Sequence, residues 1–564
     1  MHARRSYVSA RAVQILTYAL VGFLVLLPIV PIVLQSFRAT PLYDPGGAWT
    51  LSEYVALWHD ATFWQAVRTT LIFGLLSTAI SLAIGLAAAI LVARTDLPGR
   101  WLVGFIMLWP AFVSHLVLAL GWITAFGPSG FATLWLKEIV GEIPWTLYSL
   151  GGLSFAAGTS MAPLTYLYCI GAARTIDSTL ESAARIAGAG PIRAMWTVSL
   201  PMLRPAVLAS AILNFVTSIE LLALPLLLGS PSGMEFLTTF VYLRGFEAST
   251  PRHGLVAAVA VVLLFAVTAL VLIQTKLLGD TRRFVTVGGK ATRPRLISLG
   301  IWRYPIAIGF FAFEALFIVA VLFAPVVRSF VDVLTPFVPI FDVLTLENFQ
   351  SIFGYDQFIR SIWNTVLVAL IGGFLGTCLI AAAALVSLRS DLPGAAGLGF
   401  LALYPRAVPG VLVGMGIVWA VAWVPGLSLL QNTIAILIVA FIMRYLPIGW
   451  GAIQPALLQI SPDHDRAARS AGAGWLSVVT RVLLPQLRPA LGACFMLLFV
   501  HFIKEYAAAV FLFAPGSEVI GTTMLTFWFK GDLGAVAALG TLQIAMVLVF
   551  MTAYRLIAGG RFGG

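Results

Sequence analysis

The stretch Glu181-Ser182-Ala183-Ala184-Arg185-Ile186-Ala187-Gly188-Ala189-Gly190 recurs, in altered form, as Asp465-Arg466-Ala467-Ala468-Arg469-Ser470-Ala471-Gly472-Ala473-Gly474. In both copies a Leu-Pro step follows, ending at Pro201 and at Pro485. Alanine is the best helix former, its small side chain lets another surface approach closely, and glycine permits a turn out of the helix. Each copy therefore predicts a short helix with a surface of small residues, and the matched pair predicts two equivalent binding sites for a symmetric partner.

The repetition extends outward from these loops. Asp96-Leu97-Pro98-Gly99 recurs 295 positions later as Asp391-Leu392-Pro393-Gly394. Beyond the fourth apolar run the offset becomes 284, so the first copy carries about 11 extra residues. A repeat of this size indicates that one structural unit occurs twice in the chain. We predict a first half at 1–278 with its loop at 174–204, a basic cytoplasmic linker at 279–304, and a second half at 305–564 with its loop at 457–488.

The composition places both halves in a lipid bilayer. Of the 564 residues 60% are hydrophobic and 10% are charged, whereas soluble domains carry about 25% charged residues. Because lipid cannot satisfy free backbone groups, the long apolar runs must be helices. The expected fold is all-α and polytopic, with about twelve transmembrane helices, placed near 15–37, 67–93, 102–126, 149–172, 205–229, 254–277, 305–328, 362–388, 397–423, 432–454, 489–513 and 536–556.

The basic residues set the orientation of these spans. Most of the 34 Lys and Arg residues fall in segments that share one side if the N-terminus is inside, above all in the linker. The positive-inside rule then puts both termini in the cytoplasm. Short basic clusters between apolar runs are typical of membrane topology and do not indicate a nucleic-acid partner. The run at 15–37 exceeds the ~7–15 apolar residues of a secretory signal, so we expect a retained span.

The doubled loop resembles the "EAA" loop of the permeases of binding-protein-dependent ABC importers of the type I fold. The stretch Ile219–Pro225 and the linker from Arg283 to Tyr304 look like fused permeases of the ferric-iron group. The chain departs from the family at Ser182 and Arg466, which stand where the family has glutamate. The resemblance implies a multi-pass protein of the bacterial inner membrane, without cofactor or enzymatic activity. It also implies that two short helices, the coupling helices, contact two cytoplasmic ATPase subunits. The residues of this contact are Glu181, Ala183, Ala184, Gly188, Asp465, Ala467, Ala468 and Gly472. The same resemblance implies a periplasmic substrate-binding protein.

Five ionisable residues fall within the predicted spans: Glu220, Glu314, Arg444, Lys504 and Glu505. Such groups are costly in a membrane and usually face one another or a pathway. Two interpretations stay open, namely structural ion pairs between helices and the lining of a translocation path. The three cysteines and six histidines are scattered, and no spacing indicates a metal site.

The cargo and the class of transporter also have alternatives. The resemblance favours ferric iron, and Glu220 and Glu505 suit a hard cation, but Lys504 and Arg444 would equally attract a phosphate. Related permeases carry phosphorylated sugars, phosphonates, thiamine or polyamines. An ion-coupled secondary transporter also has two six-span halves, but Leu97 and Leu392 stand where its loop motif needs arginine. A membrane-embedded enzyme is disfavoured because no phosphate-binding loop or HExxH motif occurs.

Overall fold

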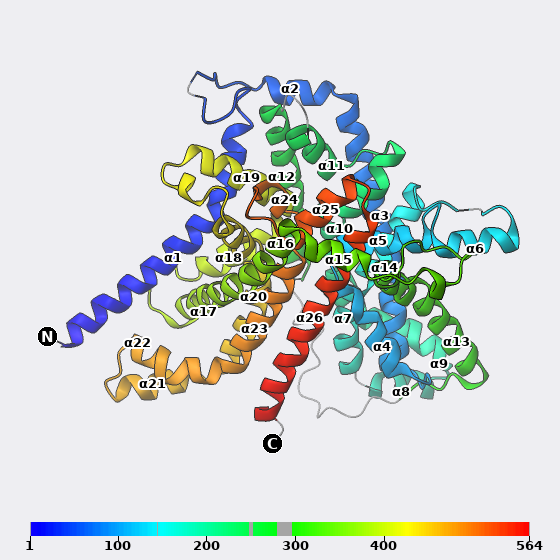
Figure 1. Ribbon diagram of the computed structural model, residues 1–564. Helices are drawn as coiled ribbons and strands as arrows, with labels where there is room; N and C mark the ends of the chain where they lie inside the picture. The colour runs from blue at the N-terminus through cyan, green and yellow to red at the C-terminus, as the bar shows by residue number, and fades with distance from the viewer. Residues whose placement is uncertain are drawn as a thin grey trace.

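The computed structural model describes residues 2–44, 46–143, 145–176, 178–247, 252–278 and 296–562. Within them the chain forms a bundle of long helices joined by short ones (Figure 1). The long helices of the first half are α1 (His2–Gln35), α3 (Ala61–Arg94), α7 (Leu150–Thr175), α10 (Leu200–Glu220) and α12 (His253–Leu278). Those of the second half are α13 (Arg303–Glu314), α14 (Ala320–Ser329), α16 (Asp356–Leu367), α17 (Gly373–Arg389), α20 (Ile434–Gln459), α23 (Leu484–Lys504) and α26 (Leu533–Phe562).

The helices agree with an all-α polytopic protein. In the described residues, 10 helices are long and apolar enough to cross a membrane, or up to 11 if one bent pair counts as a span. The predicted fourth span is also present, as the 26-residue α7. It is absent from those 10, and it is rich in Gly, Ser, Thr and Ala. Most of α7 is buried among other helices, so it does not need an apolar surface toward lipid.

The third span of each half is broken, and the expectation of one continuous helix there is wrong. In the second half α18 (Gly397–Leu403) and the turn Tyr404–Ala407 are bent by 107° against α19 (Gly410–Trp423). In the first half α4 (Arg100–Leu108) and the turn Trp109–Phe112 precede α5 (His115–Phe126). Val113 and Val408 are extended at the two breaks. Val408 precedes Pro409, and a residue before proline is disfavoured in the helical conformation.

The two halves exchange their first spans. α1 packs on α19 of the second half, and α14 packs on α5 of the first half. Both contacts need a glycine on the third span. A Cβ at Gly121 would lie 2.1 Å from the carbonyl oxygen of Val321, and a Cβ at Gly416 would lie 2.3 Å from that of Pro28. Because Gly416 stands 295 positions after Gly121, the exchange obeys the repeat seen in the sequence.

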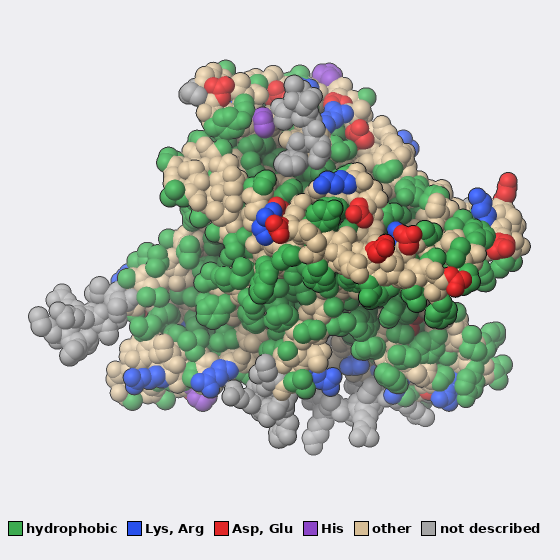
Figure 2. Space-filling view, in the orientation of Figure 1, with side chains coloured by type: hydrophobic (Ala, Val, Ile, Leu, Met, Phe, Trp, Pro, Cys, Tyr) green, Lys and Arg blue, Asp and Glu red, His purple; other side chains and the backbone are tan. Residues whose placement is uncertain are grey.

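The molecule has two polar ends separated by an apolar belt (Figure 2). In Figure 1, α2 (Ser52–His59) and α11 (Leu237–Tyr242) lie at the upper end, whereas α8 (Ser178–Ile186) and α21 (Pro462–Ser470) lie at the lower end. The C-terminal end of α26 and the N-terminal end of α1 point toward the lower end (Figure 1). This placement keeps the two predicted loops on one side of the belt.

Most of the predicted linker at 279–304 lies outside the described residues. Its described part returns to the first half, where the backbone N–H of Ile297 donates to the carbonyl oxygen of Arg94 at 2.7 Å. The N–H of Leu299 donates to Asp96 Oδ1 at 3.0 Å, and this hydrogen bond lowers the pKa of the Asp96 carboxyl. The Asp-Leu-Pro-Gly turn of the first half thus binds the chain that enters the second half.

Candidate functional site

Both repeated loops fold into the predicted helix and turn. Pro462 is the first residue of α21, and the Ser461 hydroxyl accepts the N–H of Asp463 at 3.2 Å, a cap that favours helix initiation. The turns after the helices contain Gly188 at φ +87° and Gly472 at φ +84°. The N–H of Ala473 then donates to the carbonyl oxygen of Ala468 at 3.0 Å, which is the usual closure of a helix end by a left-handed glycine.

The small residues of these helices face outward. Ala183 and Ala467 are exposed, and the next residues, Ala184 and Ala468, are half-buried. Gly188 and Gly472 are exposed as well, and no described atom lies within 4 Å of a Cβ built on either. The two loops therefore offer open, small-residue surfaces of matching design at one end of the molecule.

The acidic residues of the loops point the other way. Glu181 is buried and forms an ion pair with Arg94 at the end of α3, and the Ser199 hydroxyl donates to the same carboxylate. In the second half Asp465 is buried and pairs with Arg389 at the end of α17, with 3.4 Å between Nη1 and Oδ2. The two pairs occupy equivalent places in the repeat. We call them the loop ion pairs.

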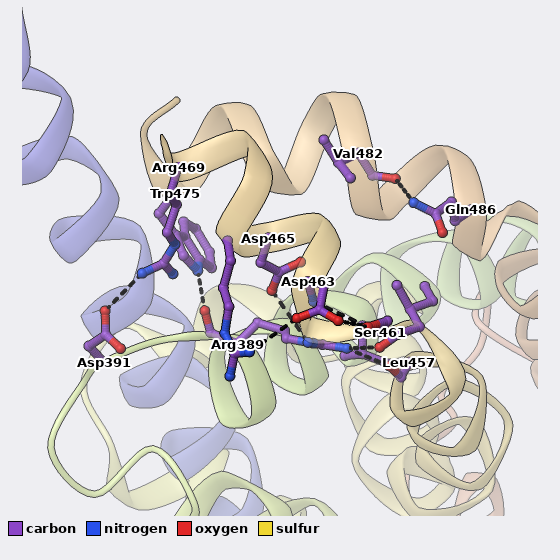
Figure 3. Close-up of polar contacts among 12 residues, drawn as sticks. Arg389, Asp391, Leu457, Ser461, Asp463, Asp465, Arg469, Trp475, Val482 and Gln486 are labelled. Atoms are coloured by element: carbon purple, nitrogen blue, oxygen red, sulfur yellow. Dashed lines mark hydrogen bonds and ion pairs between the residues drawn. The ribbon is translucent and has the colours of Figure 1, made fainter. Parts of the chain in front are cut away.

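Arg389 also binds the end of the fourth span (Figure 3). Its Nη2 donates to the carbonyl oxygen of Leu457 at 3.0 Å and to that of Ile460. The indole N–H of Trp475 donates to the Arg389 carbonyl oxygen at 2.8 Å. One guanidinium thus connects α17, α20 and α21, so a displacement of α21 would be transmitted to two spans. Arg94 is 1% exposed and holds the corresponding place in the first half.

A second candidate site lies in the belt, between the halves. A cavity of about 620 Å³ is lined by residues from both, including the start of α5, the ends of α10 and α23, and the middle of α20. Its ionisable Lys, Arg, Glu and His residues are His115, Glu220, Arg406, Arg444, His501, Lys504 and Glu505. Four of the five residues predicted to line a path are therefore brought together here.

Two helices end at this cavity, earlier than expected. The apolar runs predict fifth spans that reach 229 and 513, but α10 ends at Glu220 and α23 at Lys504. The following residues, Leu221 and Glu505, are extended. Glu220 and Lys504 are equivalent in the repeat, so the two halves place opposite charges at the same helix end.

The charged groups differ in how they are held. Lys504 Nζ donates to the carbonyl oxygen of Ala111 at 2.5 Å. Glu505 accepts from Arg444 Nε at 3.2 Å, from the Tyr445 hydroxyl, and from the N–H of Ala508 at 2.9 Å. Both oxygens of Glu505 are thus occupied by donors, which argues against Glu505 as a ligand for a cation.

Glu314 is the predicted path residue that lies elsewhere. It is the last residue of α13, it is completely buried, and neither carboxylate oxygen has a hydrogen-bond partner in the described part of the chain. It does not line the cavity between the halves. The position of Glu314 within an apolar run predicts its depth in the membrane but not the direction of its side chain.

Several polar cavity residues are not among those predicted from the sequence, including His115, Arg406, His501 and Tyr506. The Tyr506 hydroxyl accepts the N–H of Ala223 at 2.8 Å and so links the halves. Arg406 directly follows Pro405, the proline that matches Pro110 in the repeat. A search for ionisable residues beside the repeated prolines would have found it.

The chain is similar to known transport proteins over most of its length. A family model described as "Binding-protein-dependent transport system inner membrane component" matches residues 79–283 and 380–561. A ferric transport system permease protein of Actinobacillus pleuropneumoniae is 26% identical over 86% of this chain and 69% of its own length. A putative ferric transport system permease protein of Haemophilus influenzae is 27% identical over 79% and 69%. An sn-glycerol-3-phosphate transport system permease protein of Salmonella typhi is 30% identical over 42% of this chain and 81% of its own length.

Proposed function

The chain belongs to the family of binding-protein-dependent transport system inner membrane components, and we propose that it is the ferric-iron permease of an ABC importer in a bacterial inner membrane. The observation that supports this most is the pair of matched loops, α8 and α21, on one side of the apolar belt. Two equivalent surfaces suit two ATPase subunits, which would hydrolyse ATP for a chain that is not itself an enzyme. A periplasmic binding protein would deliver the cargo at the opposite end.

The geometry suggests how ATP would drive the spans. In the proposed mechanism, closure of the ATPase dimer draws α8 and α21 toward each other through the surfaces around Ala183 and Ala467. The loop ion pairs pass this displacement to α3 and α17, and Arg389 passes it to α20. The cavity between the halves would then open outward to receive the cargo, and hydrolysis would return it to the inward-facing state. The halves 1–278 and 305–564 would be the two partners of this rocking, each moving together with the first span of the other half, because α1 packs on α19 and α14 packs on α5.

Ferric iron is the favoured cargo because the ferric permeases match both halves. The phosphate-ester permease covers 42% of this chain, and a partial match of that size carries less weight. The carboxylate of Glu220 forms no hydrogen bond or ion pair within the described residues, so it is available in the cavity to bind a cation.

Loss of the permease is expected to stop growth under iron limitation in a strain with no other ferric importer. Growth should return when the permease, its ATPase and its binding protein are supplied together, and Glu220→Gln should restore less ⁵⁵Fe uptake than the wild-type chain. Normal growth of the deletion strain would refute the iron assignment and leave the permease assignment intact. A phosphate-ester cargo would instead make Lys504→Gln the more harmful change, with no iron uptake at any stage.

Cysteine labelling should place the two loops in the cytoplasm. Ser477→Cys, next to α21, is expected to react with a membrane-impermeant maleimide only after the membrane is opened, and Asp356→Cys should react in intact spheroplasts. Both positions are exposed. The background should be the chain with Cys169, Cys378 and Cys494 replaced by serine or alanine. Labelling of Ser477→Cys in intact spheroplasts would invert the proposed topology.

A further inference from the structure

The cavity between the halves has more positive than negative charge. Arg406, Arg444 and Lys504 line it against two carboxylates, Glu220 and Glu505. Because Glu505 is paired with Arg444 at 3.2 Å, the balance among the remaining groups is two cations against one carboxylate. Charges in a site removed from bulk water interact far more strongly than they do in water. The excess positive charge therefore determines which cargo the cavity accepts.

One of these cations, Arg406, has hydrogen-bond donors to offer. Arg406 is half-buried at the cavity wall, and its side chain makes no hydrogen bond or ion pair to any residue that the structure describes. Arg444 Nη1 also lacks a hydrogen-bond partner in the described residues, but it is buried against Gly410 and contributes its charge only. A ligand with several acceptor oxygens would satisfy the Arg406 guanidinium, and guanidinium suits oxyanions particularly well.

The broken third spans add to the positive potential. α5 begins at His115, which lines the cavity. α19 begins at Gly410, two residues after Val408 in the cavity wall. Its first turn lies against Arg444, since a Cβ at Gly410 would lie 1.2 Å from Arg444 Nη1. Helix N-termini carry partial positive charge and free N–H groups, which favour anions.

We infer that the cavity binds an oxyanion, and that iron crosses the membrane as a ferric–oxyanion complex and not as a bare trivalent ion. In this arrangement the oxyanion faces Arg406, Arg444 and Lys504, and Glu220 lies toward the metal. The inference rests on the proposed ferric function. It explains how a cavity with surplus positive charge, which would repel a bare trivalent cation, serves an iron importer.

The test is transport by the full permease, reconstituted in liposomes with its ATPase subunits and its binding protein. The binding protein is loaded with ⁵⁵Fe in the presence of ³²P-labelled phosphate, or of ¹⁴C-labelled citrate or carbonate, as the only oxyanion. With at least one of the three, both labels are expected to accumulate together in an ATP-dependent manner. Accumulation of ⁵⁵Fe with none of the three labels would overturn the inference and leave the ferric function standing. Accumulation of an oxyanion without ⁵⁵Fe in any arm would refute the ferric function itself.

Arg406 is the residue to vary, because its replacement removes charge from the cavity without breaking a side-chain hydrogen bond or ion pair within the described residues. Arg406→Gln is expected to lower the accumulation of both labels by about tenfold or more, the usual effect of losing a hydrogen bond to a charged group. Arg406→Lys is the matched control that keeps the charge, and it should retain most of the transport. If Arg406→Gln carries both labels as well as the wild-type chain does, the positive charge serves packing alone and the oxyanion site is refuted.

Discussion

Valine at Gly472 or at Gly188 is expected to abolish uptake while the permease still inserts into the membrane. Both glycines have φ near +85°, a region that β-branched residues rarely adopt, and such strain costs about 1–3 kcal/mol at each site. To avoid this strain, the backbone of the turn would adopt another conformation, and α21 or α8 would no longer be positioned to contact the ATPase. Uptake and binding-protein-stimulated ATP hydrolysis in liposomes measure the effect.

Asparagine provides the matched control for this prediction. It tolerates the left-handed conformation better than any β-branched residue does, and the space beside both glycines is open. Gly472→Asn should therefore keep substantial uptake. Gly190, which has open space but no positive φ, should accept alanine with little effect. Normal transport by Gly472→Val with intact ATPase coupling would show that these loops do not have the proposed role.

Removal of one partner of a loop ion pair is expected to destabilise the protein strongly. Arg94→Met leaves Glu181 buried without its cation, and breaking a buried pair in this way costs about 3–5 kcal/mol. The double variant Arg94→Met/Glu181→Met should recover much of that loss, because no charge is then left unpaired. Thermal unfolding of the purified protein in detergent measures both effects.

A surface pair serves as the control for this experiment. Arg466 and Asp463 are 77% and 78% exposed and lie 3.1 Å apart, so Arg466→Met should change stability by less than about 1 kcal/mol. In the second half, Arg389→Met should also uncouple ATP hydrolysis from transport, since Arg389 connects α21 to two spans. An Arg94→Met protein that unfolds at the wild-type temperature would contradict the proposed importance of the pair.

Local patterns were sufficient to predict the helices and the loops, because spanning length, the repeat and the Ala-Ala…Gly pattern are all encoded in neighbouring residues. The inward orientation of Glu181 was not predictable in this way, since its partner Arg94 lies in a different span. The breaks before His115 and Gly410 were also missed. The surrounding sequence is mostly apolar, as it is in a continuous helix, and the local signs of a break are Pro110, Pro405 and Pro409 together with the polar residues Ser114, His115 and Arg406.

The charge of the cavity required the tertiary structure. Sequence position placed Glu220 and Lys504 at equal depth, but it could not show that Arg444 neutralises Glu505 at 3.2 Å. Sequence position also could not show that Glu314 lies apart from the cavity residues, buried in a different part of the bundle. Which ionisable groups meet depends on the rotation of each helix about its axis, and the apolar runs of a membrane protein leave that rotation weakly specified.

The exchanged first spans have a consequence for biogenesis. During synthesis, α5 emerges well before α14, the helix that later packs on it at Gly121. The surface of α5 around Gly121 therefore stays uncovered by its partner until residues 320–329 have left the ribosome. In a chain cut between the halves, α14 would have to reach that surface by diffusion in the bilayer, whereas covalent continuity supplies the missing helix at high local concentration and in one-to-one ratio.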